Sequence, residues 1–153
     1  MKVLILGVGK TKHKFLVDGI IKYIKQSAPF FRIEEKYLKD EATKSDSINL
    51  ESEKLLKAIP TSYYKILLDL KGKQLDSVAF SEKLNNIRNN SNKYSGVIFI
   101  IGGHLGVNDK IRKSVDYLIS FSKVTFTHQM VRLILTEQIY RAFTIINNKK
   151  YHK

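Results

Sequence analysis

Residues 97–106 read VIFIIGGHLG, a run of five apolar residues, Val97–Ile101, that ends directly in a glycine-rich turn. An uninterrupted apolar run of this length is typical of a strand buried on both faces, as in parallel sheets. The amino-terminal run Val3–Val8 has the same character and is also followed by a glycine, Gly9. Two such strands favour a parallel sheet that helices cover on both faces.

Strand-like and helix-like segments alternate along the rest of the chain. Apolar periodicity predicts further strands at 31–38, 63–70 and 117–121, with a turn at 71–73. It predicts helices at 15–24, 50–59, from about 77, from about 108, and at 130–146. Residues 39–49 are polar without an apolar period, which predicts a long surface loop. Together these segments predict one α/β domain, residues 1–153, with a parallel-rich sheet of five to six strands.

The charge balance and the lack of cysteine narrow the function. The 153 residues carry a net charge of +13 and include no cysteine. A thiol nucleophile, a disulfide scaffold and a cysteine-ligated metal site are therefore excluded. Residues 1–25 and 121–153 each hold six basic residues and one acidic residue. Such an excess favours a polyanionic partner, with nucleic acid or an anionic membrane first. We find neither a spanning apolar run nor a signal peptide, so we expect a cytoplasmic protein.

Two glycine motifs come close to nucleotide-binding patterns and miss them. Gly7–Thr11 reads GVGKT, but Leu4 stands where a phosphate loop needs its first glycine, which disfavours an ATPase. Gly102–Gly106 reads GGHLG, and a dinucleotide fingerprint would need glycine at Ile101. Three glycines in five residues still indicate that the backbone closely approaches either a ligand or another chain segment. Both interpretations stay open at this point.

The segment 130–146 is apolar around most of its circumference. Its main stripe consists of Val131, Leu135, Ile139, Ala142 and Ile146, and Leu133, Tyr140 and Phe143 lie away from it. Such a helix is either deeply buried or shared with a second subunit, and we favour a dimer interface. Arg132 and Arg141 fall on opposite sides of this helix. A simple ion pair between Glu137 and Arg141 is the alternative to a functional role for Arg141. The only compositionally biased stretch is an asparagine-rich patch at 85–92.

The carboxy-terminal third carries a family resemblance. Residues 120–153 read SFSKVTFTHQMVRLILTEQIYRAFTIINNKKYHK. They resemble the small SPOUT-class methyltransferases called ribosomal RNA large subunit methyltransferase H. The strongest matches are Ser120, Ser122, Thr125 and His128, then Val131-Arg132, the stretch 137–142 and Tyr151-His152-Lys153. Weaker matches lie at 6–10, 68–73 and 101–103.

The resemblance implies a fold, a reaction and its partners. It implies methyl transfer from S-adenosylmethionine to N3 of a pseudouridine in a stem–loop of large-subunit (23S) ribosomal RNA. It also implies a homodimer, no metal, and a deep trefoil knot in the carboxy-terminal half. Naked RNA and the assembled ribosome both stay open as substrates. The knot loops would hold the cofactor, and they map to Leu68, Gly102, Gly103, Phe121, Ser122, Lys123, Val124, Thr125 and Phe126.

Five further residues match family motif positions near the site: His128, Arg132, Arg141, Tyr151 and His152. We expect Arg132 and Arg141 to bind RNA phosphate or to stabilise the base anion. We expect Tyr151 and His152 to place the substrate, with His152 the candidate proton acceptor.

Two alternatives compete with this interpretation. One is a knotted RNA-binding module without catalysis, which would not bind the methyl donor. The other is a SPOUT methyltransferase that acts on transfer RNA, against which the tail Tyr151-His152-Lys153 argues.

Overall fold

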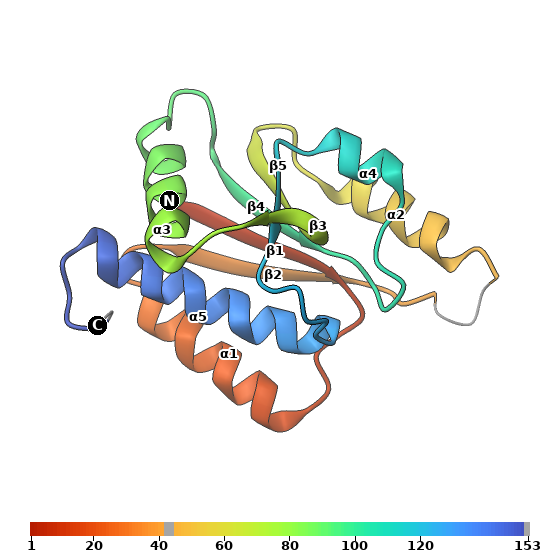
Figure 1. Ribbon diagram of the computed structural model, residues 1–153, viewed down its shortest axis with the longest axis horizontal. Helices are drawn as coiled ribbons and strands as arrows, with labels where there is room; N and C mark the ends of the chain where they lie inside the picture. Colours follow the sequence, from red (N-terminus) through yellow and green to blue (C-terminus); the bar gives the residue numbers. More distant parts are fainter. Residues whose placement is uncertain (42–44, 152–153) are drawn as a thin grey trace.

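A computed structural model describes residues 1–41 and 45–151 (Figure 1). Within these residues, strands and helices alternate without exception. In chain order they are β1 (Lys2–Val8), α1 (Lys14–Ser27), β2 (Arg32–Leu38), α2 (Ser47–Ala58), β3 (Tyr63–Gln74), α3 (Ser77–Asn89), β4 (Gly96–Ile101), α4 (Asp109–Ser114), β5 (Tyr117–Ser120) and α5 (His128–Ile146).

The strands form one sheet in the order β2-β1-β4-β3-β5, and every neighbouring pair is parallel. The expected parallel sheet is confirmed, with five strands among the described residues. The two fully apolar runs, β1 and β4, are neighbours near the middle of the sheet. Because all strands point the same way, the carboxyl ends of β1, β3, β4 and β5 lie along the same side of the sheet. We call this side, where the strands end, the carboxyl edge. The knot implied by the resemblance stays a prediction.

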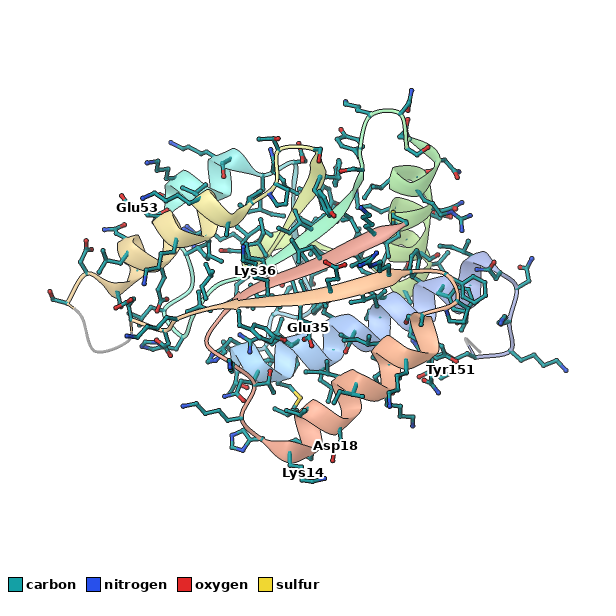
Figure 2. The ribbon with its side chains drawn as sticks, turned by 180° about the vertical axis from the view of Figure 1, so that it is seen from behind. Lys14, Asp18, Glu35, Lys36, Glu53 and Tyr151 are labelled. Atoms are coloured by element: carbon teal, nitrogen blue, oxygen red, sulfur yellow. The ribbon has the colours of Figure 1, made fainter. Side chains whose placement is uncertain are left out.

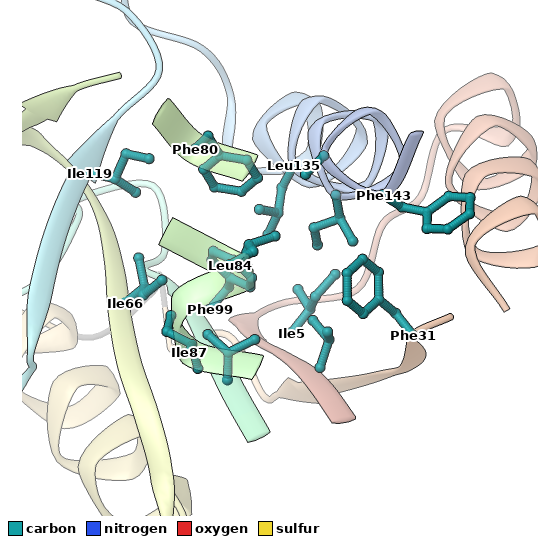
Figure 3. Packing of buried hydrophobic residues seen from close by; sticks show 14 of the residues in the cluster. Ile5, Phe31, Ile66, Phe80, Leu84, Ile87, Phe99, Ile119, Leu135 and Phe143 are labelled. Atoms are coloured by element: carbon teal, nitrogen blue, oxygen red, sulfur yellow. The ribbon is translucent and has the colours of Figure 1, made fainter. Parts of the chain in front are cut away.

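Helices cover both faces, so the hydrophobic core has two parts. Alternate residues of β1 point to opposite faces. Ile5 packs with Phe99, Leu135 and Phe143 on the side of α3 and α5 (Figure 3). Leu6 packs with Leu55, Ile98, Ile100 and Ile111 on the side of α2 and α4. Charged side chains such as those of Lys14 and Glu53 lie on the outer surface (Figure 2).

Helix α5 lies between α1 and α3 and against the sheet. None of its residues is exposed, and Leu135, Ile139 and Ala142 are fully buried. Packing within one chain covers much of this helix, but several apolar residues, among them Met130, Leu133 and Ile146, are only half-buried. The expected dimer interface on this helix stays a prediction.

Two segments differ from the sequence-based expectation. Helix α2 already begins at Ser47, inside the expected loop 39–49. The loop is also less exposed than its polarity suggests, because Glu41 is buried and its N–H donates to Glu51 Oε1 at 2.9 Å. The expected turn at 71–73 is wrong, since β3 stays extended to Gln74 and pairs with β5 beyond a register shift. Across the described residues, no helix is long and apolar enough to cross a membrane.

Candidate active site

A cavity of about 810 Å³ lies at the carboxyl edge of the sheet. Its walls come mainly from residues 68–71, 101–107, 119–122 and 124–129, which directly follow or overlap the ends of β3, β4 and β5. Open α/β sheets bind ligands beyond the carboxyl ends of their strands. The volume falls in the usual range of small-molecule sites, about 300–1,000 Å³.

Most of the candidate cofactor residues line this cavity. They are Leu68, Gly102, Gly103, Phe121, Ser122, Val124, Thr125 and Phe126. Lys123 is exposed and is not part of the wall. The structure therefore brings together three segments that lie far apart in the sequence, as the resemblance implied. Their contact with a cofactor stays a prediction.

The glycine-rich turn after β4 folds back on itself. Gly103 and Gly106 form a small antiparallel bridge, and the Gly106 N–H donates to the Gly103 carbonyl at 3.0 Å. A Cβ on Gly102 would lie 2.7 Å from the Gly106 carbonyl oxygen, and one on Gly103 would overlap the Glu51 carboxylate. Gly106 has a φ of +79°, a left-handed conformation that favours glycine. Close contacts with other parts of the chain thus explain why glycine stands at 102 and 103. The backbone of this turn lines the cavity.

Hydroxyl groups shape the wall between β5 and α5. Ser120 Oγ donates to the Ser122 carbonyl at 2.8 Å, and the Val124 N–H donates to Ser122 Oγ at 2.9 Å. Thr127 is the N-cap of α5, because its Oγ1 accepts a hydrogen bond from the Met130 N–H at 3.2 Å. Of the hydroxyl residues noted in the sequence, Ser120 and Ser122 hold the wall in place, and Thr127 adds the cap of α5.

A partly buried ion pair in the cavity wall was missed by sequence reasoning. Arg112 Nε donates to Asp69 Oδ2 at 2.9 Å, and the Asp69 side chain is only 8 % exposed. Asp69 Oδ1 also accepts a hydrogen bond from the Lys71 N–H at 2.9 Å. The aspartate was noted only as part of a weak motif at 68–73. Its partner is 43 residues away, and no local pattern links the two.

His128 lines the cavity at the start of α5. Burial, and next the positive charge of Arg132, lower the pKa of His128. Its imidazole is therefore neutral near pH 7 and able to accept a proton. His13 and His104 also line the cavity. Gln129, next to His128, fixes the loop after β1, because its Oε1 accepts a hydrogen bond from the Lys12 N–H at 2.7 Å.

Arg132 lies inside the protein. It is 0 % exposed. Its guanidinium donates hydrogen bonds to the Val8 carbonyl at 2.6 Å and to Thr11 Oγ1 at 3.0 Å. The guanidinium carbon also lies over the Tyr37 ring, 4.2 Å from the ring centre. Arg132 thus joins α5 to the end of β1 and to the loop that follows. Its guanidinium is buried in the single chain, and its expected role in binding RNA phosphate or stabilising the base anion stays a prediction.

Arg141 lies at the other end of α5. Its Nη2 is 2.6 Å from Glu137 Oε1, so the ion pair considered as the alternative is present, and a functional role for Arg141 stays a prediction. Tyr151 Oη donates to the same oxygen at 3.2 Å, and its ring packs edge-on against Tyr140. Burial, followed by contacts with Tyr23 and Glu137, raises the pKa of Tyr151.

The cavity lies far, within one chain, from the cluster formed by Glu137, Arg141 and Tyr151, which we call the tail cluster. His128 and Arg141 are thirteen positions apart along the helix, which corresponds to about 20 Å. His152, the candidate proton acceptor, and Lys153 lie outside the described residues. Over residues 1–41 and 45–151, no group of three or more His, Asp or Glu side chains is arranged to hold a metal ion.

Comparisons with known proteins identify the family of the chain. The family described as "Predicted SPOUT methyltransferase" matches residues 1–152. Proteins named ribosomal RNA large subunit methyltransferase H from Fusobacterium nucleatum and Halothermothrix orenii are 44% and 40% identical, and both alignments cover 100% of each chain. A solved structure of a probable methylase family protein from Haemophilus influenzae shares the fold, with a TM-score of 0.57 at 14% identity. It covers 99% of this chain and 70% of that chain. The chain belongs to the SPOUT methyltransferase family.

Proposed function

We propose that this protein transfers a methyl group from S-adenosylmethionine to N3 of a pseudouridine in large-subunit ribosomal RNA. The observation that best supports this proposal is the cavity at the carboxyl edge, because the segments that the family resemblance assigns to the cofactor line it. The full-length similarity to proteins named for ribosomal RNA large-subunit methylation supports this substrate. The net charge of +13 suits a polyanionic partner.

The cavity wall suits an adenosyl methyl donor. In its turn 102–106, the three glycines, Gly102, Gly103 and Gly106, present main chain without side chains at the cavity wall. Leu68 and Val131 add apolar surface against which a flat base can pack. The phosphate-binding patterns that the sequence lacks are not needed, because this donor carries no phosphate. When bound, S-adenosylmethionine supplies a methyl group on a positively charged sulfur.

The chain itself must position the acceptor and remove a proton. Methyl transfer is an in-line displacement, so orientation of donor and acceptor accounts for much of the acceleration. N3 of pseudouridine is a weak acid and loses its proton before or during transfer. His128 is placed for this role, since it lines the cavity and its pKa is lowered. His152 stays a second candidate from the resemblance.

We also propose a homodimer in which each tail completes the cavity of the other copy. Within one chain, Tyr151 lies at the far end of α5 from the cavity, so one base cannot touch both. Exposed apolar side chains surround the cavity mouth: Leu70, Leu105, Val124 and Phe126. A second copy that covers this rim would bury apolar surface and bring its tail close to the cavity.

The direct test is single-turnover methylation with a labelled methyl donor, using both naked 23S RNA and assembled large subunits that lack the methyl group. We expect transfer to one of these substrates. Of the two variants His128→Ala and His152→Ala, the one that removes the proton acceptor should lose about 100-fold or more. Unchanged rates in both Arg141→Ala and His152→Ala would contradict the roles assigned to the tail. A protein that gives no calorimetric heat with the donor or its demethylated product would be a binding module without catalysis.

Mixed dimers test the contribution of the tail. A cavity variant, Gly102→Ala, and a tail variant, Arg141→Ala, are each expected to lose activity. If tails act on the partner copy, a mixed dimer has one site with both parts intact, and activity returns on mixing. If cavity and tail act within one chain, mixing restores nothing.

A further inference from the structure

A second hollow lies at the opposite edge of the sheet, where the strands begin. We call it the amino-edge hollow. Its volume is about 270 Å³. The lining residues come from β3, from α3 and from the loop before β4, which rises at the top of Figure 1: Tyr64, Lys83, Asn86, Ile87, Asn90, Lys93 and Tyr94. It shares no lining residue with the cavity at the carboxyl edge.

Aromatic rings form one side of the amino-edge hollow. Tyr64 and Tyr94 pack edge to face, with ring centres 5.2 Å apart at 87°. The ring of Tyr117, the first residue of β5, lies 3.7 Å from Lys83 Nζ. None of the three tyrosines is fully buried. Partly exposed aromatic rings are the usual platforms on which proteins stack unpaired RNA bases.

Positive charge surrounds these rings. Burial, and next the charge of Lys73, lower the pKa of Lys83. Within residues 1–41 and 45–151, no carboxylate forms an ion pair with Lys83. Lys93 adds a third cation, 5.1 Å from the centre of the Tyr94 ring. One acid, Asp116, lies close enough to act on Lys93, and its carboxylate also accepts a hydrogen bond from the Lys65 N–H at 2.7 Å. Its single negative charge offsets only one of the two lysines that line the hollow, so a net positive charge remains that an anion would neutralise.

The asparagine-rich patch of the sequence supplies the remaining polar groups. Asn86 and Asn90 both line the hollow, and both are exposed. Asn90 Nδ2 donates to the Asn86 carbonyl at 2.7 Å, which leaves the Asn90 carboxamide oxygen as an acceptor. Carboxamides offer donors and acceptors to base edges and ribose hydroxyls. This stretch has no role in the proposed methyl-transfer site.

We propose that the amino-edge hollow binds one unpaired nucleotide of the ribosomal RNA substrate, away from the methylated base. The base would stack on Tyr94 and Tyr64, and its phosphate would lie near Lys83 and Lys93. The combination of rings, carboxamides and lysines suits a nucleotide better than a free anion. Four residues of β3 separate Tyr64 from Leu68 in the cavity wall, about 13 Å, so one RNA can reach both edges. This inference rests on the proposed function and adds a second contact to it.

The first test measures RNA affinity over a range of salt concentrations. The probe is a fluorescein-labelled transcript of the large-subunit stem–loop with its flanking single strands. We expect Lys83→Gln and Lys93→Gln each to bind several-fold more weakly and to reduce the salt slope by about 1. Tyr94→Leu should weaken binding about five-fold or more through lost stacking. The control is Lys36→Gln. Lys36 is an exposed lysine on β2, the outermost strand on the other side of the sheet from β3 and β5 (Figure 2), and this variant should bind like the wild type.

Methylation at saturating RNA separates this inference from the proposed function. All four variants should then transfer methyl groups at the wild-type rate, because none of these residues touches the cavity. If the wild type methylates the transcript and the hollow variants bind RNA normally, the amino-edge contact is refuted and the proposed function stands. If the wild type does not methylate any RNA, the proposed function fails, and the binding data still decide the hollow. Lys93 is fully exposed, so its variant gives a result even if Lys83→Gln does not fold.

A second measurement identifies the ligand chemistry. Amide chemical shifts are followed during titration with uridine 5′-monophosphate and, separately, with inorganic phosphate. We expect the nucleotide to shift amides in 83–94 at lower concentration than phosphate does. Equal responses to both would show an anion site without base recognition and would overturn the proposal.

Discussion

Replacing Gly102 by alanine tests whether the backbone of the glycine turn forms the donor site. The new Cβ would lie 2.7 Å from the Gly106 carbonyl oxygen and 2.9 Å from Val107 Cγ1. The first neighbour is backbone, so the turn must move by several tenths of an ångström to restore ordinary contact. Overpacking of this kind costs about 1–3 kcal/mol. In a chain of this size, each kcal/mol lowers the melting temperature by about 2–4 °C.

The same shift displaces the cavity wall, so donor binding should weaken. Loss of about one main-chain hydrogen bond, near 1 kcal/mol, corresponds to a fall of five- to ten-fold in affinity. Calorimetry with S-adenosylhomocysteine measures it. The matched control is Gly106→Ala, where no atom lies within 4 Å of the added Cβ and the cost is backbone strain from the positive φ. Gly102→Ala with wild-type affinity and melting temperature would refute the role of this turn.

Three further perturbations test the packing and the charges around the site. Burial lowers the pKa of His128, so the unfolded chain binds this proton more tightly and stability should fall as pH drops below about 6.5. His128→Gln should flatten that fall, as thermal melts at about pH 5 and 7 would show. Leu135→Ala, at a fully buried position, should cost about 2–5 kcal/mol in urea unfolding, whereas Ile21→Ala, 44% exposed, should cost far less. Arg132→Lys should cost about 1–3 kcal/mol, because an ammonium cannot replace both the Val8 and Thr11 hydrogen bonds; an unchanged midpoint would contradict this.

The sheet and most helices follow from local sequence patterns. The runs at Val3–Val8 and Val97–Ile101 are buried central strands, because only a strand covered on both faces tolerates continuous apolar sequence. Asn108 and Thr127 cap α4 and α5 through their side chains. Such signals depend on neighbours along the chain, so one sequence suffices to read them.

Features that depend on distant partners were not predictable in this way. Glu41 and Ser47 lie in a polar stretch, yet both are buried. The Glu41 N–H meets the Glu51 carboxylate only in the fold. The residues 71–73 suggested a turn, but β3 continues to Gln74 and pairs with β5 again at Lys73 and Gln74, beyond a register shift.

Two charged groups of the site show the same limit. The helical spacing of Arg132 and Arg141 indicated correctly that they face opposite ways. It did not indicate which of them is buried, because that depends on contacts with β1 and β2. The pairing of Asp69 with Arg112 likewise required the fold.

The central claim is methylation of one pseudouridine in large-subunit ribosomal RNA. Mass mapping of this RNA from cells with and without the protein tests it most directly. The account predicts that one pseudouridine-containing fragment loses the mass of a single methyl group when the protein is absent, and regains it when the gene is restored. Identical fragment masses in both RNAs would contradict the account.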